Sequence, residues 1–163
     1  MWQSLSIKPF YIYNIILFVT FCFIVNPTND LYILNYLFYC FFHFLLIYLA
    51  LYYYRISLYI IYFFYGLCID VLWFNEIGPH LLIFLLVLLL LNFINKYLYN
   101  FSSFKIYLFL LFLQISMIFL ELLVLNMLFN YQANLNLTIK IIFISLILSY
   151  PIFLLFSKID RIK

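Results

Sequence analysis

The stretch GLCIDVLWFNEIGPHLLIFLLVLLLL, residues 66–91, decides the class of this protein. Its last part, residues 81–91, is apolar throughout, and only a short polar segment separates it from the apolar residues before it. A helix needs about 20 apolar residues to cross the roughly 30 Å hydrocarbon core of a bilayer. Pro79 suits the first turn of a helix, where a missing N–H costs nothing. The stretch therefore predicts the end of one membrane helix, a tight turn and the start of the next.

The composition of the whole chain supports the same class. Of its 163 residues, 71% are hydrophobic and only 8% are charged, whereas ordinary soluble domains carry about 25% charged residues. The net charge of +3 is too small and too dispersed to suggest a nucleic-acid patch. We therefore predict an all-α membrane protein, residues 1–163 forming one polytopic domain in contact with lipid. Its cysteines lie in apolar stretches without the paired spacing of a disulfide or metal framework; they are Cys22, Cys40 and Cys68.

Polar breaks divide the chain into six predicted transmembrane helices. The first and fourth are short and need a few more residues at each end to span a bilayer. The first is expected to be retained, because no small-residue cleavage pattern follows it. The connections are tight, which predicts antiparallel hairpins between neighbours, although the second and third helices could also form one long element kinked at Arg55. The predicted helices cover about residues 10–25, 31–54, 56–74, 79–94, 104–129 and 139–156.

The distribution of Lys and Arg predicts the orientation, because basic residues are enriched in cytoplasmic loops. With six helices and a cytoplasmic N-terminus, only Lys140 among the basic residues falls on the outer side, where Asp30 and Glu76 also lie. Both termini are therefore predicted to be cytoplasmic. The basic residues on the inner side are Lys8, Arg55, Lys96, Lys105, Lys158, Arg161 and Lys163.

Asp70 is the first candidate functional residue, because ionisable side chains inside a membrane are costly and usually face the bundle interior. Gly66 lies one turn before it on the same face, where a missing side chain lets another helix approach closely. Gly78 can supply a turn with positive φ, and the first amides of the following helix can donate to Asp70. His80 is expected to belong to this turn. Two interpretations stay open: an acid that stabilises the hairpin, or an acid in a ligand or partner cavity.

Glu121 is the second candidate and lies deeper in the predicted fifth helix. Gln114 precedes it on one face and Asn126 follows it toward the outer side, which suggests a polar stripe. The stripe either fixes helix packing through hydrogen bonds or forms a site for a partner helix or small polar ligand. No basic residue is placed at a matching depth, so a buried ion pair with Glu121 is not expected. His43 is expected to be a hydrogen-bonded packing histidine.

The sequence contains no motif that indicates catalysis. HExxH, GxSxG, P-loop and GxGxxG patterns are absent, and no nucleophile is spaced with a base. His43 and His80 are expected on different helices and make a poor metal site. We therefore predict no enzyme activity, no cofactor and no metal.

In a chain of this size, the segment from Gly66 to His80 resembles the bacterial rod-shape-determining protein family MreD. In that family a glycine precedes an acid by four residues, and an apolar-Gly pair ends a short turn eight residues after the acid. Gly66, Asp70 and Ile77-Gly78 stand at those spacings. Further similar positions are Pro27 in an outer loop, Asn35 at the second helix, Glu121 and Asn126 in the fifth, and Pro151 before the basic tail.

The resemblance implies a non-enzymatic scaffold of the cell-elongation machinery in the bacterial inner membrane. Such proteins bind MreC and, through it, the MreB cytoskeleton and the RodA glycosyltransferase with its class B penicillin-binding partner. The family fold is similar to the substrate-binding component of energy-coupling-factor transporters. Two other hypotheses stay open: a vitamin-binding transporter component, and a small hydrophobic subunit of a respiratory complex. Identification of co-purifying partners would discriminate between them.

Overall fold

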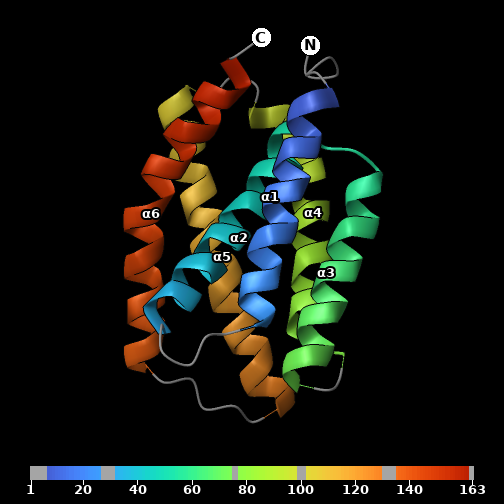
Figure 1. Cartoon of the computed structure of the whole chain (residues 1–163), viewed down its shortest axis with the longest axis vertical. Helices are drawn as coiled ribbons and strands as arrows, with labels where there is room; N and C mark the ends of the chain where they lie inside the picture. Colours follow the sequence, from blue (N-terminus) through green and yellow to red (C-terminus); the bar gives the residue numbers. More distant parts are fainter. Residues whose placement is uncertain (1–6, 27–31, 75–76, 99–101, 130–134, 162–163) are drawn as a thin grey trace.

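The computed structural model describes residues 7–26, 32–74, 77–98, 102–129 and 135–161. This part of the chain is almost entirely α-helical and contains no β-strand. The helices run up and down, with the N- and C-terminal ends of the chain at the same end of the bundle (Figure 1). Their bounds are α1 Ile7–Val25, α2 Tyr32–Tyr52, α3 Ser57–Phe74, α4 Pro79–Leu98, α5 Ser103–Phe129 and α6 Leu135–Arg161.

Helix α2 lies at the centre of the bundle and contacts α1, α4, α5 and α6 (Figure 1). All side chains of residues 42–51 are buried. A helix that is apolar on every face must bury every face or meet lipid, and α2 is the helix that the protein itself encloses. The other five helices share the outer surface.

The prediction that every pair of neighbouring helices forms a packed hairpin is wrong for α2 and α3. α2 ends at Tyr52 and α3 begins at Ser57, so they are also not one kinked element. The two helices make little contact, whereas α3 packs closely on α4. The reason is that the other helices already surround α2. The tight link through Arg55 therefore leads the chain outward to pack α3 on α4.

Three helices extend at least three residues further than the polar breaks suggest. One is α1, which begins at Ile7 and was expected to need more residues, as was α4. α4 begins at Pro79 as predicted but continues to Leu98, and α6 runs from Leu135 to Arg161 with Pro151 in its interior. The predicted helix ends lie at the first polar residues. Polar residues readily continue a helix where its end projects into water. A proline inside an apolar helix is tolerated where neighbouring groups satisfy the freed carbonyl. The end expected at Pro27 lies outside the described residues.

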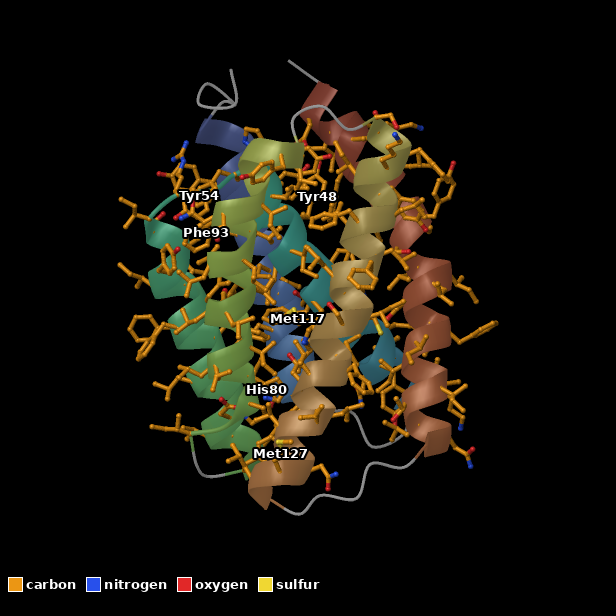
Figure 2. All side chains as sticks on the ribbon, turned by 180° about the vertical axis from the view of Figure 1, so that it is seen from behind. Tyr48, Tyr54, His80, Phe93, Met117 and Met127 are labelled. Carbon is orange, nitrogen blue, oxygen red and sulfur yellow. The ribbon has the colours of Figure 1, made fainter. Side chains whose placement is uncertain are left out.

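The outer surface of the bundle is apolar. Large hydrophobic side chains point away from the helices along the length of the bundle (Figure 2), and many are more than half exposed. Soluble monomers rarely show contiguous apolar patches of this extent. Four helical segments are long and apolar enough to cross a membrane, and the apolar parts of α1 and α4 are shorter. The four are Ile33–Tyr52, Ser57–Phe74, Ser103–Leu128 and Asn136–Asp160.

The α3–α4 hairpin is held by a close backbone contact at Gly66. A Cβ placed on Gly66 would lie 2.5 Å from Cα and 2.8 Å from the backbone nitrogen of Leu81. Both neighbours are backbone atoms and cannot rotate away. The close approach predicted from this glycine is therefore confirmed, and it brings the start of α4 against Asp70.

Candidate functional site

Asp70 caps the start of α4. Its Oδ1 accepts hydrogen bonds from the backbone N–H of His80 at 3.1 Å and from Nδ1 of the His80 ring at 2.8 Å. Its Oδ2 accepts the backbone N–H of Leu81 at 2.9 Å. The first amides of a helix have no partner within the helix, and a carboxylate there also meets the positive end of the helix dipole. The predicted hydrogen bonds from these amides to Asp70 are thus confirmed.

Glu121 of α5 lies against two residues of α2. Nε2 of His43 lies 2.8 Å from Oε1 and 3.1 Å from Oε2 of Glu121, and the hydroxyl of Tyr39 donates to Oε2. The expectation that Glu121 has no basic partner is wrong. The partner is a histidine and not a Lys or Arg, and only the packing of α2 on α5 brings His43 to Glu121. The prediction that His43 is a hydrogen-bonded packing histidine is confirmed.

His80 lies between the two acids. Its ring is bound to Asp70 through Nδ1, and its Nε2 lies 4.0 Å from Oε2 of Glu121. Four helices thus contribute to one polar cluster, in which His43, Asp70, His80 and Glu121 are almost fully buried. We call these four residues and Tyr39 the polar cluster. The sequence singled out its acids and histidines one by one without indicating that they meet.

Hydrogen-bond geometry places two protons of the His43–Glu121 pair. Nδ1 of His43 lies 2.8 Å from the backbone carbonyl of Tyr39, which can only accept, so this nitrogen carries a hydrogen. One further proton lies between His43 and Glu121, and that pair is neutral overall. Asp70 accepts from two amides and from Nδ1–H of His80, and Nε2 of the same ring faces Oε2 of Glu121 at 4.0 Å.

Gln114 and Asn126, the other members of the predicted stripe, lie elsewhere. Nε2 of Gln114 donates to the backbone carbonyl of Cys40 at 2.8 Å and approaches Ser145 of α6 at 3.4 Å, so Gln114 joins α5 to its neighbours. Asn126 is exposed and does not belong to the polar cluster. Five residues correspond to a rotation of about 140° from Glu121 around the helix, which explains why the predicted stripe breaks there. Gly78 is buried directly before Pro79.

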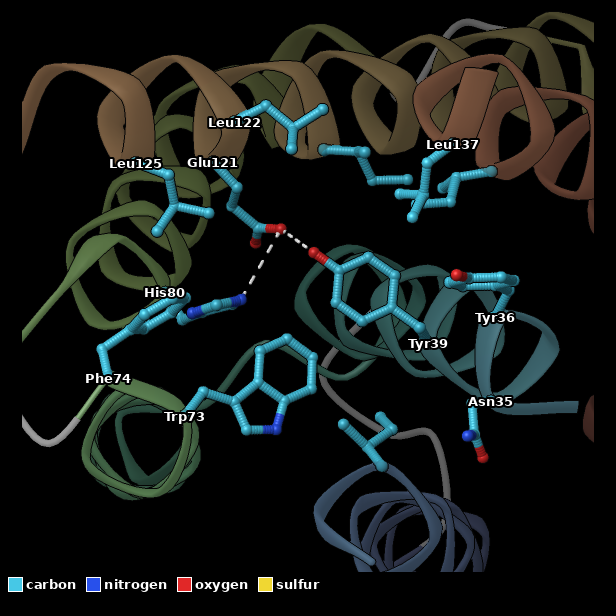
Figure 3. A pocket seen from close by; sticks show the side chains of 13 residues that line it. Asn35, Tyr36, Tyr39, Trp73, Phe74, His80, Glu121, Leu122, Leu125 and Leu137 are labelled. Atoms are coloured by element: carbon cyan, nitrogen blue, oxygen red, sulfur yellow. Dashed lines mark hydrogen bonds and ion pairs between the residues drawn. The ribbon is translucent and has the colours of Figure 1, made fainter. Parts of the chain in front are cut away.

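A cavity of about 370 Å³ opens beside the polar cluster. Figure 3 shows Glu121, His80 and Tyr39 pointing toward one another, with Leu122 and Leu125 on either side of Glu121. Ligand sites are typically mostly apolar pockets of this size with a few convergent polar groups. The described lining residues are Ile24, Asn35, Tyr36, Tyr39, Trp73, Phe74, His80, Ile118, Glu121, Leu122, Leu125, Leu137 and Ile141.

The site offers hydrogen-bonding groups and two buried acids, each paired with a histidine. Among the described residues, no group of three metal-ligating side chains is close enough to hold a metal ion. The absence of enzyme activity stays a prediction. Comparisons with protein families, with curated proteins and with solved structures find no match to this chain.

A second cluster of polar side chains, which sequence reasoning missed, lies near the chain termini. The carboxylate of Asp160 in α6 accepts hydrogen bonds from Tyr13 at 2.8 Å, from Tyr48 at 2.5 Å and from Tyr53. Tyr48 lies toward the termini and His80 toward the other end of the bundle (Figure 2). In the sequence, Asp160 stands within a basic tail, and the tyrosines stand within apolar stretches. The signal that could have indicated the cluster is an acid at the end of an apolar helix in a tyrosine-rich chain.

We expect Asp160→Ala to lower the free energy of unfolding by about 1–3 kcal/mol, because it leaves the hydroxyls of Tyr48 and Tyr53 without their acceptor. Tyr13 keeps the backbone carbonyl of Phe156 as an acceptor. Thermal unfolding of the purified protein in a mild detergent, followed by circular dichroism, measures this loss. Lys158→Ala is the control, since Lys158 is exposed on the same helix and should change stability by less than about 0.5 kcal/mol. Equal melting temperatures for the two variants would show that the cluster does not stabilise α6.

Proposed function

We propose that the chain is a six-span membrane protein with both termini in the cytoplasm. α1 and α4 contain 19 and 20 residues, and about 20 residues at 1.5 Å each match the roughly 30 Å hydrocarbon core. The apolar outer surface supports insertion of all six helices. The excess of Lys and Arg toward the end that carries the termini supports the orientation.

We propose further that it acts as a non-enzymatic scaffold of the rod-shape complex in a bacterial inner membrane, with an MreC-like partner. The observation that carries this proposal is the α3–α4 hairpin. Gly66, Asp70 and Gly78 have the spacing of the MreD family, and the first two have structural tasks: close packing at Gly66 and capping of α4 by Asp70. A rigid hairpin held without chemistry suits a protein that positions partners. MreB, RodA and its class B penicillin-binding partner would be reached through MreC.

Removal of the protein is expected to round a rod-shaped host, and affinity purification in mild detergent is expected to recover an MreC-like protein. Two variants locate the contact with the partner. Loss of the partner in Arg55→Ala indicates a contact through a connection between helices. Loss of the partner in Glu121→Gln indicates that binding depends on the polar cluster inside the bundle. Normal rods after clean deletion, in a host with no second copy, would refute the scaffold function. Recovery of redox subunits would instead favour a respiratory complex.

The alternative function is that of a small-molecule-binding component of a membrane transporter, such as a vitamin-binding one. The cavity beside the polar cluster favours it, because a pure scaffold does not need a pocket of about 370 Å³ with buried polar groups. Transport of a vitamin that depends on this chain in cells, together with recovery of a coupling subunit in place of an MreC-like protein, would establish the alternative.

A further inference from the structure

We propose that the cavity beside the polar cluster binds one apolar chain of a lipid-like molecule, and that the chain enters from the bilayer between α5 and α6. The inference rests on the proposed insertion of the bundle in a membrane and goes beyond the scaffold function. Three observations carry it: an apolar lining beside acids that already have partners, a second cavity on the outer surface of the same two helices, and partly exposed lining residues at one end of the bundle.

The acids beside the cavity are already paired. Glu121 is bound by His43 and Tyr39, and Asp70 is bound by His80 and by two amides of α4. No Lys or Arg lies among the described lining residues of the cavity. A charged ligand group would have to displace one of these partners or lose its water without compensation, which is costly. The part of the ligand that the cavity encloses is therefore uncharged.

The remainder of the lining is apolar. Tyr36, Trp73 and Phe74 supply aromatic rings, while Leu122 of α5 and Ile141 of α6 belong to the aliphatic part. Since the bilayer is as apolar as these side chains, the affinity for a chain must come from close packing. An empty cavity deprives its lining of dispersion contacts, and an apolar chain that fills it restores them.

A second cavity, of about 280 Å³, lies between α5 and α6 on the outer surface of the bundle. Its lining includes Phe112 and Phe119, which are 67% and 60% exposed. Ile118 lines both cavities, so the two adjoin the same side chain. Together they follow α5 from Leu111 to Leu125, which is about 21 Å at 1.5 Å per residue. An apolar path of this length, open to the bilayer, suits an extended chain better than a compact ring.

The head of such a molecule has a place at the end of the bundle away from the chain termini. α2 and α6 begin at that end (Figure 1). Asn35 and Leu137, in the first turns of these helices, line the cavity and are partly exposed. A chain in the cavity can therefore keep its polar head at the membrane surface. The volume of about 370 Å³ lies at the small end of ligand pockets, which favours one chain over two.

The test follows the fluorescence of Trp73, which lines the cavity, in a Trp2→Phe background that removes the other of the two tryptophans. The probe is 6,7-dibromo-1-dodecanol, added to the full chain in lipid nanodiscs, because bromine quenches tryptophan at short range. Probe dissolved in the bilayer quenches in proportion to its amount, whereas binding in the cavity saturates. We expect saturable quenching that 1-dodecanol reverses and that cyclododecanol, a ring with as many carbons, does not. Absence of saturable quenching, or equal competition by the ring, would overturn the proposal.

Two variants with the same substitution locate the binding site. Leu122→Phe narrows the cavity and is expected to weaken binding of the brominated dodecanol about tenfold or more. Leu123→Phe is the matched control and should bind as the parent does, because Leu123 is 36% exposed and is not a described lining residue. The purified chain is measured without a partner, so a failure here leaves the scaffold function untouched. Unchanged affinity in folded Leu122→Phe overturns the proposal, and if that variant does not fold, unchanged affinity in Leu137→Phe does so.

Discussion

Gly66→Ala is expected to lower the free energy of unfolding by about 2 kcal/mol, although alanine is the better helix former. The added Cβ would lie 2.5 Å from Cα of Leu81, and overpacking of this kind costs about 1–3 kcal/mol, occasionally more. We place the cost near the upper end because the opposing atoms are backbone. Alanine gains up to about 1 kcal/mol over glycine in a helix, which offsets only part of it. Thermal unfolding in a mild detergent measures the difference.

The control for Gly66→Ala is Val71→Ile, which also adds one carbon to α3. Val71 is 45% exposed, so this carbon meets no backbone, and the change in stability should stay within about 0.5 kcal/mol. Displacement of α4 by the alanine would also separate Asp70 from the amides of His80 and Leu81. An unchanged or raised melting temperature for Gly66→Ala would show that α3 and α4 do not approach this closely.

The hairpin could be predicted from the sequence because its interactions are local. Asp70 and the amides that it accepts are 10 and 11 residues apart, and a short turn between two helices leaves few arrangements. Pro79 marks the start of α4, and Gly66 marks the face that must lie near it. The helical class could be predicted because the apolar stretches are long and continuous, and a helix satisfies its backbone hydrogen bonds within one such stretch.

The polar cluster as a whole could not be predicted, because its second half depends on long-range packing. His43 and Glu121 are 78 residues apart, and the sequence gives the depth of each but not the rotation of its helix. The central position of α2 was also hidden, since an apolar helix in protein and one in lipid have the same composition. The cluster at Asp160 joins residues more than 100 positions apart. The assignment of charged residues to loops, which predicts orientation, does not indicate which of them has a partner inside the bundle.

Asp70→Asn is expected to lower the free energy of unfolding by about 3 kcal/mol, near the cost of breaking a buried pair by removing one partner. All three hydrogens that reach Asp70 come from N–H groups: two backbone amides and Nδ1 of His80. An asparagine keeps one acceptor oxygen, and its NH₂ must face one of these donors. The backbone amides cannot reverse their roles, so at least one buried donor loses its acceptor.

Asp160→Asn is the matched control for Asp70→Asn, and the comparison separates loss of charge from loss of an acceptor. Tyr13 and Tyr53 share Oδ1 of Asp160, while Tyr48 alone faces Oδ2. A hydroxyl can accept as well as donate, so the asparagine NH₂ can donate to Tyr48 while its oxygen keeps the other two tyrosines. We expect a cost below about 1 kcal/mol. Similar losses in the two variants, measured by thermal unfolding in the same detergent, would mean that the charge of Asp70, and not its fixed donors, holds the hairpin.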